Sequence, residues 1–158
     1  MKGWSVLVAG LRRVEGDPGK MLDGMRTQNP GVLLQAADAQ AVYGIEHAIG
    51  ALQIALKAYE RNVMIADKVE TEVLLRLART DQIADALKKT GLKKGVPGCF
   101  IGFSKDAQAL KNLGDRLADM DLDDSVIEAS KEKAEKMASG QKRVLDYLLE
   151  RAAIMVRS

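Results

Sequence analysis

Histidine, cysteine and tryptophan each occur only once among the 158 residues of this chain. One histidine and one cysteine are too few for a zinc finger, a two-histidine zinc site or a disulfide framework, so we expect no metal and no disulfide bond. Apolar runs are also short, and none approaches the roughly 18 residues that span a membrane. Because the first residues do not follow the pattern of a secretion signal, we expect a cytoplasmic protein without membrane contact.

An excess of charge of one sign is lacking as well. The chain has 24 Lys+Arg against 22 Asp+Glu, a formal net charge of +2, which is too small to indicate broad binding to nucleic acid. Residues 57–94 are mildly positive, whereas residues 115–135 are clearly negative. Two surfaces of opposite charge suit two different partners, and two ordinary solvated faces are the alternative.

What is present is an ordinary soluble composition, 47% apolar and 29% charged, with a length that fits one domain. Three short apolar runs predict strands over residues 4–11, 32–37 and 96–103. The first run is apolar at consecutive positions, which indicates that both of its sides are covered. We therefore expect this strand to lie in the centre of the sheet.

Apolar residues at steps of three and four predict helices through the rest of the chain. The predicted helices cover residues 18–28, 39–61, 69–77, 80–90, 104–117, 125–137 and 140–155. We expect Asp38, Thr80 and Ser104 to cap helix N-termini, and Gly91 to end a helix in the left-handed conformation. Helix outweighs strand, so the predicted fold class is α+β, a single helix-rich domain over residues 1–158 with a small central β-sheet.

Motifs that carry catalysis or metal binding are weak or absent. The segment 119–130 begins like a calcium loop, but Asp124 stands where glycine is needed and Ser130 where a chelating glutamate is needed. His47 is not part of a recognisable nucleophile arrangement, and we interpret it as a helix residue at the border of the core. Cys99 lies in an apolar strand and is interpreted as a small core residue. We expect no catalytic residues.

The order of features from residue 47 to residue 95 resembles a known family. The resemblance is carried by the helix sequence HAIGALQIALKAYERN and by the segment ETEVLLRLARTDQIADALKKTGLKKG, which begins at Glu70. The third predicted strand and the late sequence LERAAI keep the same order. On these residues the chain resembles the small tRNA-binding, kinase-associated subunit of the KEOPS (EKC) complex, the family that includes the PRPK-binding protein. Asp81 next to Gln82 departs from the family pattern.

The resemblance implies a subunit that is not an enzyme and that needs no cofactor. It implies a role in making threonylcarbamoyl-adenosine (t6A) in tRNA, where a different subunit performs the transfer. The subunit resembled here binds an atypical kinase/ATPase directly and reaches the threonylcarbamoyl-transferase through that kinase. It also captures the single-stranded 3′ CCA end of the tRNA.

With this resemblance in hand, a helix N-terminus near residue 80 becomes a candidate contact for RNA, because its unpaired backbone N–H groups can hold a phosphate. The residues that we predict to face tRNA are Arg76, Arg79, Gln82, Ile83, Lys88 and Lys89. Arg79 would contact a phosphate or base, Gln82 a base edge and Ile83 a base face, and the other three supply a positive field. Asp81 opposes phosphate. The alternative is that Arg79 and Gln82 are ordinary exposed residues and that Ile83 lies in the core.

The terminal predicted helix is the candidate contact for the kinase. It supplies more apolar side chains than one core-facing stripe needs, and we predict a protein interface there. The residues of this predicted interface are Leu145, Leu149, Ile154 and Met155. Glu72 is interpreted as a solvent-exposed partner of Arg76 four residues later, a pair worth a few tenths of a kcal/mol.

Two other functions stay open on the sequence alone. One is a pure protein adaptor or regulator of a kinase, with a helical docking face and no RNA contact. The other is an enzyme of unrecognised type, which no motif in the sequence supports.

Overall fold

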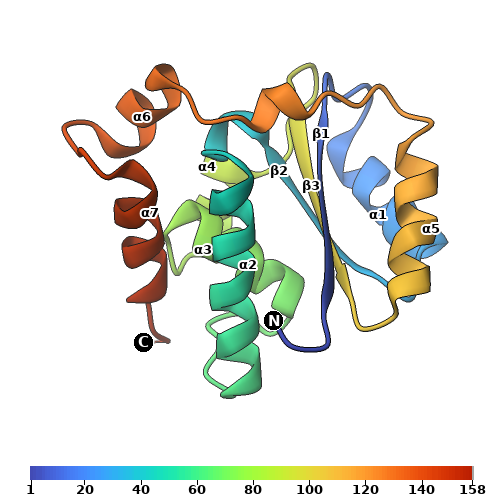
Figure 1. Ribbon diagram of the computed structural model, residues 1–158, viewed down its shortest axis with the longest axis horizontal. Coiled ribbons are helices and arrows are strands. Elements are labelled where there is room, and N and C mark those ends of the chain that lie inside the picture. The colour runs from blue at the N-terminus through green and yellow to red at the C-terminus, as the bar shows by residue number, and fades with distance from the viewer. Residues whose placement is uncertain (158) are drawn as a thin grey trace.

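The chain folds around a three-stranded antiparallel sheet with helices on both of its faces (Figure 1). The computed structural model describes residues 1–157. The strands are β1 (Ser5–Leu11), β2 (Leu33–Asp38) and β3 (Gly98–Ser104). The helices are α1 (Pro18–Gln28), α2 (Ile45–Glu60), α3 (Val69–Ala78), α4 (Ile83–Thr90), α5 (Ala107–Leu117), α6 (Lys131–Ala138) and α7 (Val144–Ala153), with two 3-10 helices, η1 (Ala39–Ala41) and η2 (Asp124–Ile127). The predicted α+β class with a small sheet is confirmed.

The strand order is β1-β3-β2, so β3 lies in the centre and the other two strands form the edges. Every residue of β3 is buried. Ile101 of β3 faces Val8 of β1 on one side and Gln35 of β2 on the other. The predicted central place of residues 4–11 is therefore wrong. Their consecutive apolar residues reflect helices that cover both faces of the sheet, which an edge strand needs as much as a central one.

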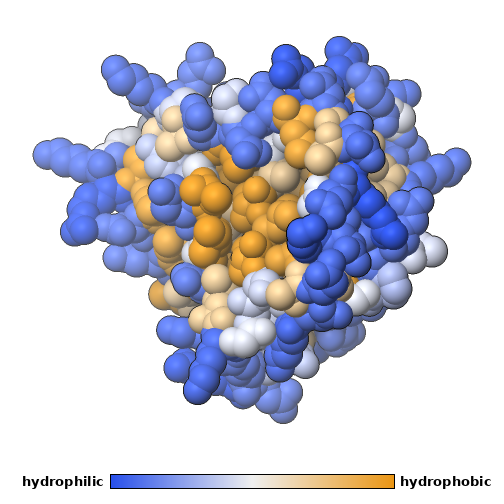
Figure 2. Space-filling model, turned by 45° about the vertical axis from the view of Figure 1, so that its right-hand side comes forward, coloured by the Kyte–Doolittle hydropathy of each residue, from blue (hydrophilic) through white to orange (hydrophobic). Residues whose placement is uncertain are grey.

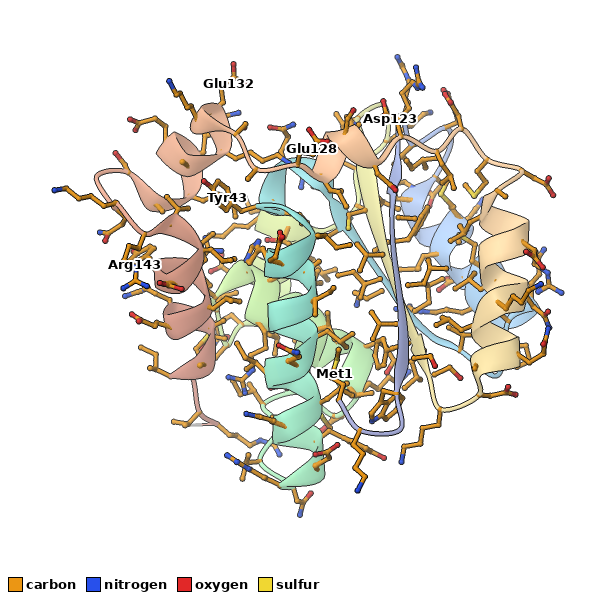
Figure 3. The ribbon with its side chains drawn as sticks, viewed as in Figure 1. Met1, Tyr43, Asp123, Glu128, Glu132 and Arg143 are labelled. Carbon is orange, nitrogen blue, oxygen red and sulfur yellow. The ribbon has the colours of Figure 1, made fainter. Side chains whose placement is uncertain are left out.

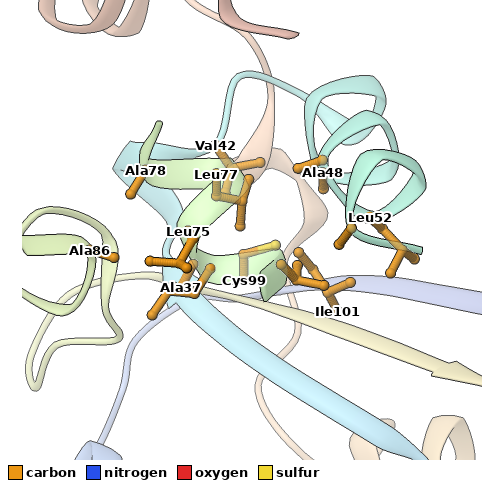
Figure 4. Packing of buried hydrophobic residues seen from close by; sticks show 14 of the residues in the cluster. Ala37, Val42, Ala48, Leu52, Leu75, Leu77, Ala78, Ala86, Cys99 and Ile101 are labelled. Carbon is orange, nitrogen blue, oxygen red and sulfur yellow. The ribbon is translucent and has the colours of Figure 1, made fainter. Parts of the chain in front are cut away.

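The two faces of the sheet have separate cores. On one face, Cys99 and Ile101 pack against α2 and α3, whose buried side chains include Leu52 and Leu75 (Figure 4). On the other face, Phe100 packs with apolar side chains of α1 and α5. A fully buried leucine or phenylalanine contributes about 1.5–3 kcal/mol relative to an exposed one. The sheet is thus the middle layer between two helical layers.

Helix α7 packs on α2 and α3 and lies beyond α2 from the sheet (Figure 1). Leu149 of α7 lies over Gly50 of α2. A Cβ atom on Gly50 would lie only 2.6 Å from Leu149 Cδ2. The glycine therefore permits the close contact between α2 and α7.

Several predicted helices begin later than their periodic pattern suggests, α7 among them, which begins at Val144 rather than at residue 140; at two of these helices local caps decide the start. α2 begins at Ile45 rather than at residue 39, since Gly44 has a φ of +85°. Asp38 caps η1 instead, by accepting a hydrogen bond from the N–H of Gln40. The predicted helix 125–137 is interrupted between η2 and α6, and Ser130 caps the start of α6.

The caps predicted at Thr80 and Ser104 are each displaced by two residues. Gln82 is the N-cap residue of α4, and Thr80 Oγ1 accepts a hydrogen bond from its N–H. Asp106 caps α5, whereas Ser104 ends β3 and its hydroxyl accepts a hydrogen bond from the N–H of Asp106.

Gly91 follows α4, but it is not left-handed as predicted. Its φ is −62° and it forms an isolated bridge with Ala37. A Cβ atom at this position would overlap the carbonyl group of Leu87. Glycine is therefore required for close packing rather than for an unusual dihedral angle. The left-handed residue that ends a helix in this region is Arg79, with a φ of +56°.

Candidate functional site

The short helix α4 carries an exposed apolar pair beside lysine side chains. Ile83 and Leu87 lie one helical turn apart and are 49% and 56% exposed. The alternative that places Ile83 in the core is therefore wrong. Lys88 and Lys89 are also exposed, and Lys89 pairs with Asp85 at 3.4 Å. This surface offers apolar area and positive charge together.

The N-terminus of α4 is open. The side chain of Gln82 makes no capping bond, and its Nε2 donates to Asp81 Oδ1 at 3.2 Å. Within residues 1–157, nothing accepts a hydrogen bond from the backbone N–H groups of residues 83–85. These groups can receive an acceptor from outside the chain. The neighbouring Asp81 carboxylate weakens their attraction for an anion.

Arg79 connects α3 to α4 and is half-buried. Its Nη1 donates to the carbonyl oxygen of Leu77 at 2.9 Å. Burial lowers the pKa of Arg79, nearby Tyr147 raises it and the charge of Arg151 lowers it. An arginine nevertheless stays charged at neutral pH. No carboxylate in the described part of the chain forms an ion pair with Arg79, so it is a cation without an anionic partner.

Arg76 and Glu72 form a buried ion pair. Their side chains are 3% and 0% exposed, and Arg76 Nη2 lies 2.7 Å from Glu72 Oε2. Arg76 Nη1 donates to the carbonyl oxygens of Ala152 and Met155, and Glu72 Oε1 accepts a hydrogen bond from the N–H of Ala66. The predicted pairing is confirmed, but its predicted exposure to solvent is wrong. Arg76 therefore presents almost no surface to RNA.

A groove lies between α2 and α7. It contains a cavity of about 730 Å³ and a neighbouring one of about 680 Å³, which share the lining residues Ile54, Lys57 and Ala153. Met1 lines the first cavity and lies beside α2 (Figure 3). The second cavity continues to Val156. The groove thus follows α2 towards the C-terminal end of α7.

The four residues predicted to face the kinase differ in their surroundings. Leu149 lines the first cavity and Met155 the second. Ile154 is 71% exposed, whereas Leu145 is half-buried and lines neither cavity. Three of the four therefore lie at or beside the groove.

His47 and Cys99 are both fully buried. His47 Nδ1 accepts a hydrogen bond from the N–H of Tyr43, which places the proton on Nε2, and Nε2 has no hydrogen-bond partner among residues 1–157. Burial, assisted by the charges of Arg79 and Lys133, lowers the pKa of His47 to about 4. Burial raises the pKa of Cys99 to about 12. A neutral imidazole and a protonated thiol result at pH 7. Cys99 is a core residue, as predicted, whereas His47 lies inside the core rather than at its border.

The candidate calcium loop is organised by its own side chains. Asp123 accepts hydrogen bonds from the hydroxyl and the N–H of Ser125, which lower the pKa of Asp123. Arg12 lies 3.8 Å from the same carboxylate. Among residues 1–157, no group of three or more His, Cys, Asp or Glu side chains is placed to hold a metal ion. The helices of this part of the chain are all too short or too polar to cross a membrane.

Comparison with known protein families gives a match over most of the chain. The model of a family described as kinase binding protein CGI-121 matches residues 17–142. The matched segment runs from the start of α1 to just beyond α6, and it therefore includes α4 and most of the sheet. A comparison with curated proteins gives no match.

Proposed function

Because the chain belongs to the CGI-121 family of kinase binding proteins, we propose that it is the small, non-catalytic subunit of a KEOPS complex. In this proposal it takes part in t6A formation by binding the atypical kinase/ATPase of the complex directly. It reaches the threonylcarbamoyl-transferase through that kinase and holds the 3′ CCA end of the tRNA. The observation that carries the proposal is the family match over residues 17–142.

The kinase contact is assigned to the groove between α2 and α7. Its lining combines the apolar side chains of Ile54 and Leu149 with the charged side chains of Lys57 and Glu150. Protein interfaces have this composition, an apolar centre within a polar rim. The exposed Ile154 extends the apolar area beyond the end of α7.

Ala153→Arg tests this assignment, because Ala153 is exposed and lines both cavities. The larger, charged side chain fills the groove, and we expect at least about tenfold weaker binding to the kinase in co-purification or calorimetry. Ala118→Arg, at the exposed end of α5, is the matched control and leaves binding unchanged. Equal binding by both variants would contradict the position of the interface. Absence of any kinase bound to the unaltered chain would contradict the function itself.

The tRNA end is assigned to the exposed surface of α4. Ile83 and Leu87 offer an apolar platform for a base face, and the free N–H groups at the helix start can bind a phosphate. Gln82 lies at the same end of α4, and Arg79 and Lys88 add positive charge. Arg76 is left out because it is buried in its pair with Glu72.

This surface suits a short contact rather than a long one. Asp81 and Asp85 stand near the helix start, and Lys89 is already paired with Asp85. Few phosphates are therefore neutralised, and the affinity falls only weakly with salt. The logarithm of the binding constant decreases with the logarithm of the salt concentration by a slope of about 0.7 for each phosphate contacted in a single strand. A single-stranded end three or four nucleotides long meets this condition.

Removing CCA from a cognate tRNA is the direct test of the RNA contact. We expect the intact tRNA to bind more tightly than the shortened one in a filter-binding or fluorescence assay. Lys88→Glu should weaken binding and reduce the salt slope, whereas Lys136→Glu makes the same charge change on exposed α6 and should leave both unchanged.

Three outcomes contradict parts of this proposal. Equal affinity for the two tRNAs would remove end capture. Kinase binding without any tRNA binding at low salt would identify a pure kinase adaptor. Turnover of an acyl or phosphoryl substrate by the purified chain alone would contradict a non-catalytic role.

A further inference from the structure

The outer edge of β1 is closed at one end and open at the other. At the closed end, the N–H of Gly10 donates to Asp124 Oδ1 at 2.9 Å, and its carbonyl accepts a hydrogen bond from the N–H of Asp123 at 2.8 Å. The N–H of Arg12 donates to the carbonyl of Asp121 on the same side. In the part of the chain that the structure describes, no strand follows on this side of β1, because the order is β1-β3-β2.

Val6 and Val8 direct their backbone groups to this same side. In a strand, the backbone groups of every second residue point the same way, so the side that Gly10 uses is also the side of Val6 and Val8. Ser5, Leu7 and the other odd-numbered residues bond to β3. In the described chain, no group pairs with Val6 or Val8 on the outer side. The edge thus presents two backbone N–H donors and two carbonyl acceptors, with the spacing that a neighbouring β-strand needs.

The surroundings of this open edge are apolar. Helices α2 and α5 lie on either side of β1 (Figure 1), and an apolar area appears between polar margins on this face (Figure 2). A cavity of about 280 Å³ lies beside Val8 and is lined by the apolar side chains of Ile45 and Ile127. The side chains of Val6 and Val8 point towards the face of the sheet that α2 and α3 cover, because they pack against the core on that face.

The charged side chains that line the cavity are all acidic. Glu46, Asp124 and Glu128 line it, and no lysine or arginine among residues 1–157 does; the buried Lys133, whose Nζ donates to the carbonyl oxygen of Val126, lies behind the lining near Glu128. Glu46 and Glu128 form no ion pair within residues 1–157. Figure 3 shows Asp123 and Glu128 near one end of β1 and Met1 near the other. A ligand that lies along the edge therefore meets negative charge at the Val8 end.

We propose that the open edge of β1 binds an extended segment of another protein, which adds to the sheet as a fourth strand. The segment pairs its backbone with Val6 and Val8, places one apolar side chain in the cavity and brings a lysine or arginine to Glu46 and Glu128. Strand addition gives affinity through main-chain hydrogen bonds and specificity through alternate side chains. The basic residue supplies the charge complementarity that the cavity requires.

A single segment fits this edge better than a second copy of the chain. β1 lies between α2 and α5, so a second copy would bring its own α2 and α5 against those of the first. A separate strand carries no such helices. None of Val6, Val8 and Ile127 lines the groove between α2 and α7, so this site goes beyond the kinase and tRNA contacts proposed above.

The probe is the peptide acetyl-Lys-Val-Thr-Val-Thr-Val-Lys-amide, titrated into the full chain labelled with ¹⁵N. Lysine at both ends brings one lysine to the acidic end in either strand direction. We expect saturable binding at roughly 0.1–1 mM, with shifted resonances and slower hydrogen exchange for the amides of Val6 and Val8. The same peptide with glutamate in place of both lysines should bind at least about fivefold more weakly.

Two variants locate the binding. Val8→Pro removes an outward N–H without breaking the ladder to β3, a position where an edge strand tolerates proline, and should abolish binding. Glu128→Lys should weaken binding severalfold, whereas Glu132→Lys on α6 makes the same charge change outside the cavity and should not. If Val8→Pro does not fold, the peptide with proline at its central valine provides the same test in the ligand.

Absence of saturable binding by the lysine peptide, or unchanged binding in folded Val8→Pro, would overturn the proposal. Concentration-dependent dimers of the chain alone, with Val6 and Val8 amides protected, would identify a second copy as the occupant and also overturn it. Neither result depends on a kinase or on tRNA, so the proposed function is tested separately.

Discussion

Replacement of Arg76 by methionine tests whether the buried ion pair fastens α7 to the rest of the molecule. The change leaves the Glu72 carboxylate with a single donor, the N–H of Ala66. It also removes the donor that the carbonyl oxygens of Ala152 and Met155 share. Glu72 is 0% exposed, so water does not replace the lost partner in the folded state.

The expected loss follows from this geometry. A buried charge that loses its partner costs about 3–5 kcal/mol, out of a total stability of about 5–15 kcal/mol. For a chain of this size the melting temperature falls by roughly 6–20 °C. In the double variant Glu72→Met with Arg76→Met no buried charge remains. Like the single variant it leaves the carbonyl oxygens of Ala152 and Met155 without this donor, and it adds the orphaned N–H of Ala66, about 1–3 kcal/mol.

Urea unfolding followed by circular dichroism measures these losses. Asp115→Asn is the matched control, because Lys111 and Asp115 form a pair of the same spacing with side chains 69% and 68% exposed. Its loss should stay below about 1 kcal/mol. The reasoning is refuted if Arg76→Met loses no more than Asp115→Asn, or if the double variant is less stable than the single one.

Two further predictions concern acid and glycine. In the folded chain the pKa of His47 is about 4, against 6.5 for the free side chain. As the pH falls, the unfolded chain therefore takes up this proton first. The free energy of unfolding decreases from pH 7 to pH 4, by about 3 kcal/mol at most. His47→Asn should flatten this slope in urea unfolding between pH 5 and 6.5, and an unchanged slope would show that another group is responsible. Gly10→Ala should cost about 1–3 kcal/mol, because its Cβ overlaps the carbonyl oxygen of Asp123. Gly24→Ala, in α1 with nothing within 4 Å of its Cβ, should instead stabilise by about 0.5–1 kcal/mol; equal effects in thermal unfolding would contradict the packing argument.

Much of the fold could be predicted because burial leaves a period in the sequence. The three strands and most helices lie within a few residues of their predicted places, and the family resemblance is confirmed by the family match. The hydrophobic pattern does not show, however, which strands are neighbours in the sheet. Consecutive apolar residues in β1 show that both faces are covered, and they hold no information on which edge carries another strand.

The buried charges were the hardest features to predict. Arg76 had a signal, because it lies in the run VLLRLA, where a helix that is apolar all round excludes water from any charged residue within it. Lys133 had none. It is buried, and its Nζ donates to the carbonyl oxygens of Val42 and Val126, two acceptors that only the completed fold brings together. Burial lowers the pKa of Lys133.

The candidate sites, too, combine features that the sequence pattern indicates with features that only tertiary packing decides. Exposure of Ile83 and Leu87 follows from tertiary packing, which the local pattern of α4 does not contain, whereas burial of Arg76 could be read from the apolar run around it. The roles proposed for Arg79, Gln82, Lys88 and Lys89, and for Leu145, Leu149, Ile154 and Met155, stay predictions until a partner is bound.

The strand order has a consequence for synthesis on the ribosome. β1 and β2 are made first but do not pair with each other, since each pairs only with β3. At about 5–20 residues per second, the ribosome needs about 3–13 s to pass from residue 38 to residue 104. During this interval α2, α3 and α4 are completed and make contacts that are close in sequence, which form quickly. The two early strands stay unpaired and apolar until β3 emerges, and the nascent chain is most accessible to binding by chaperones in those seconds.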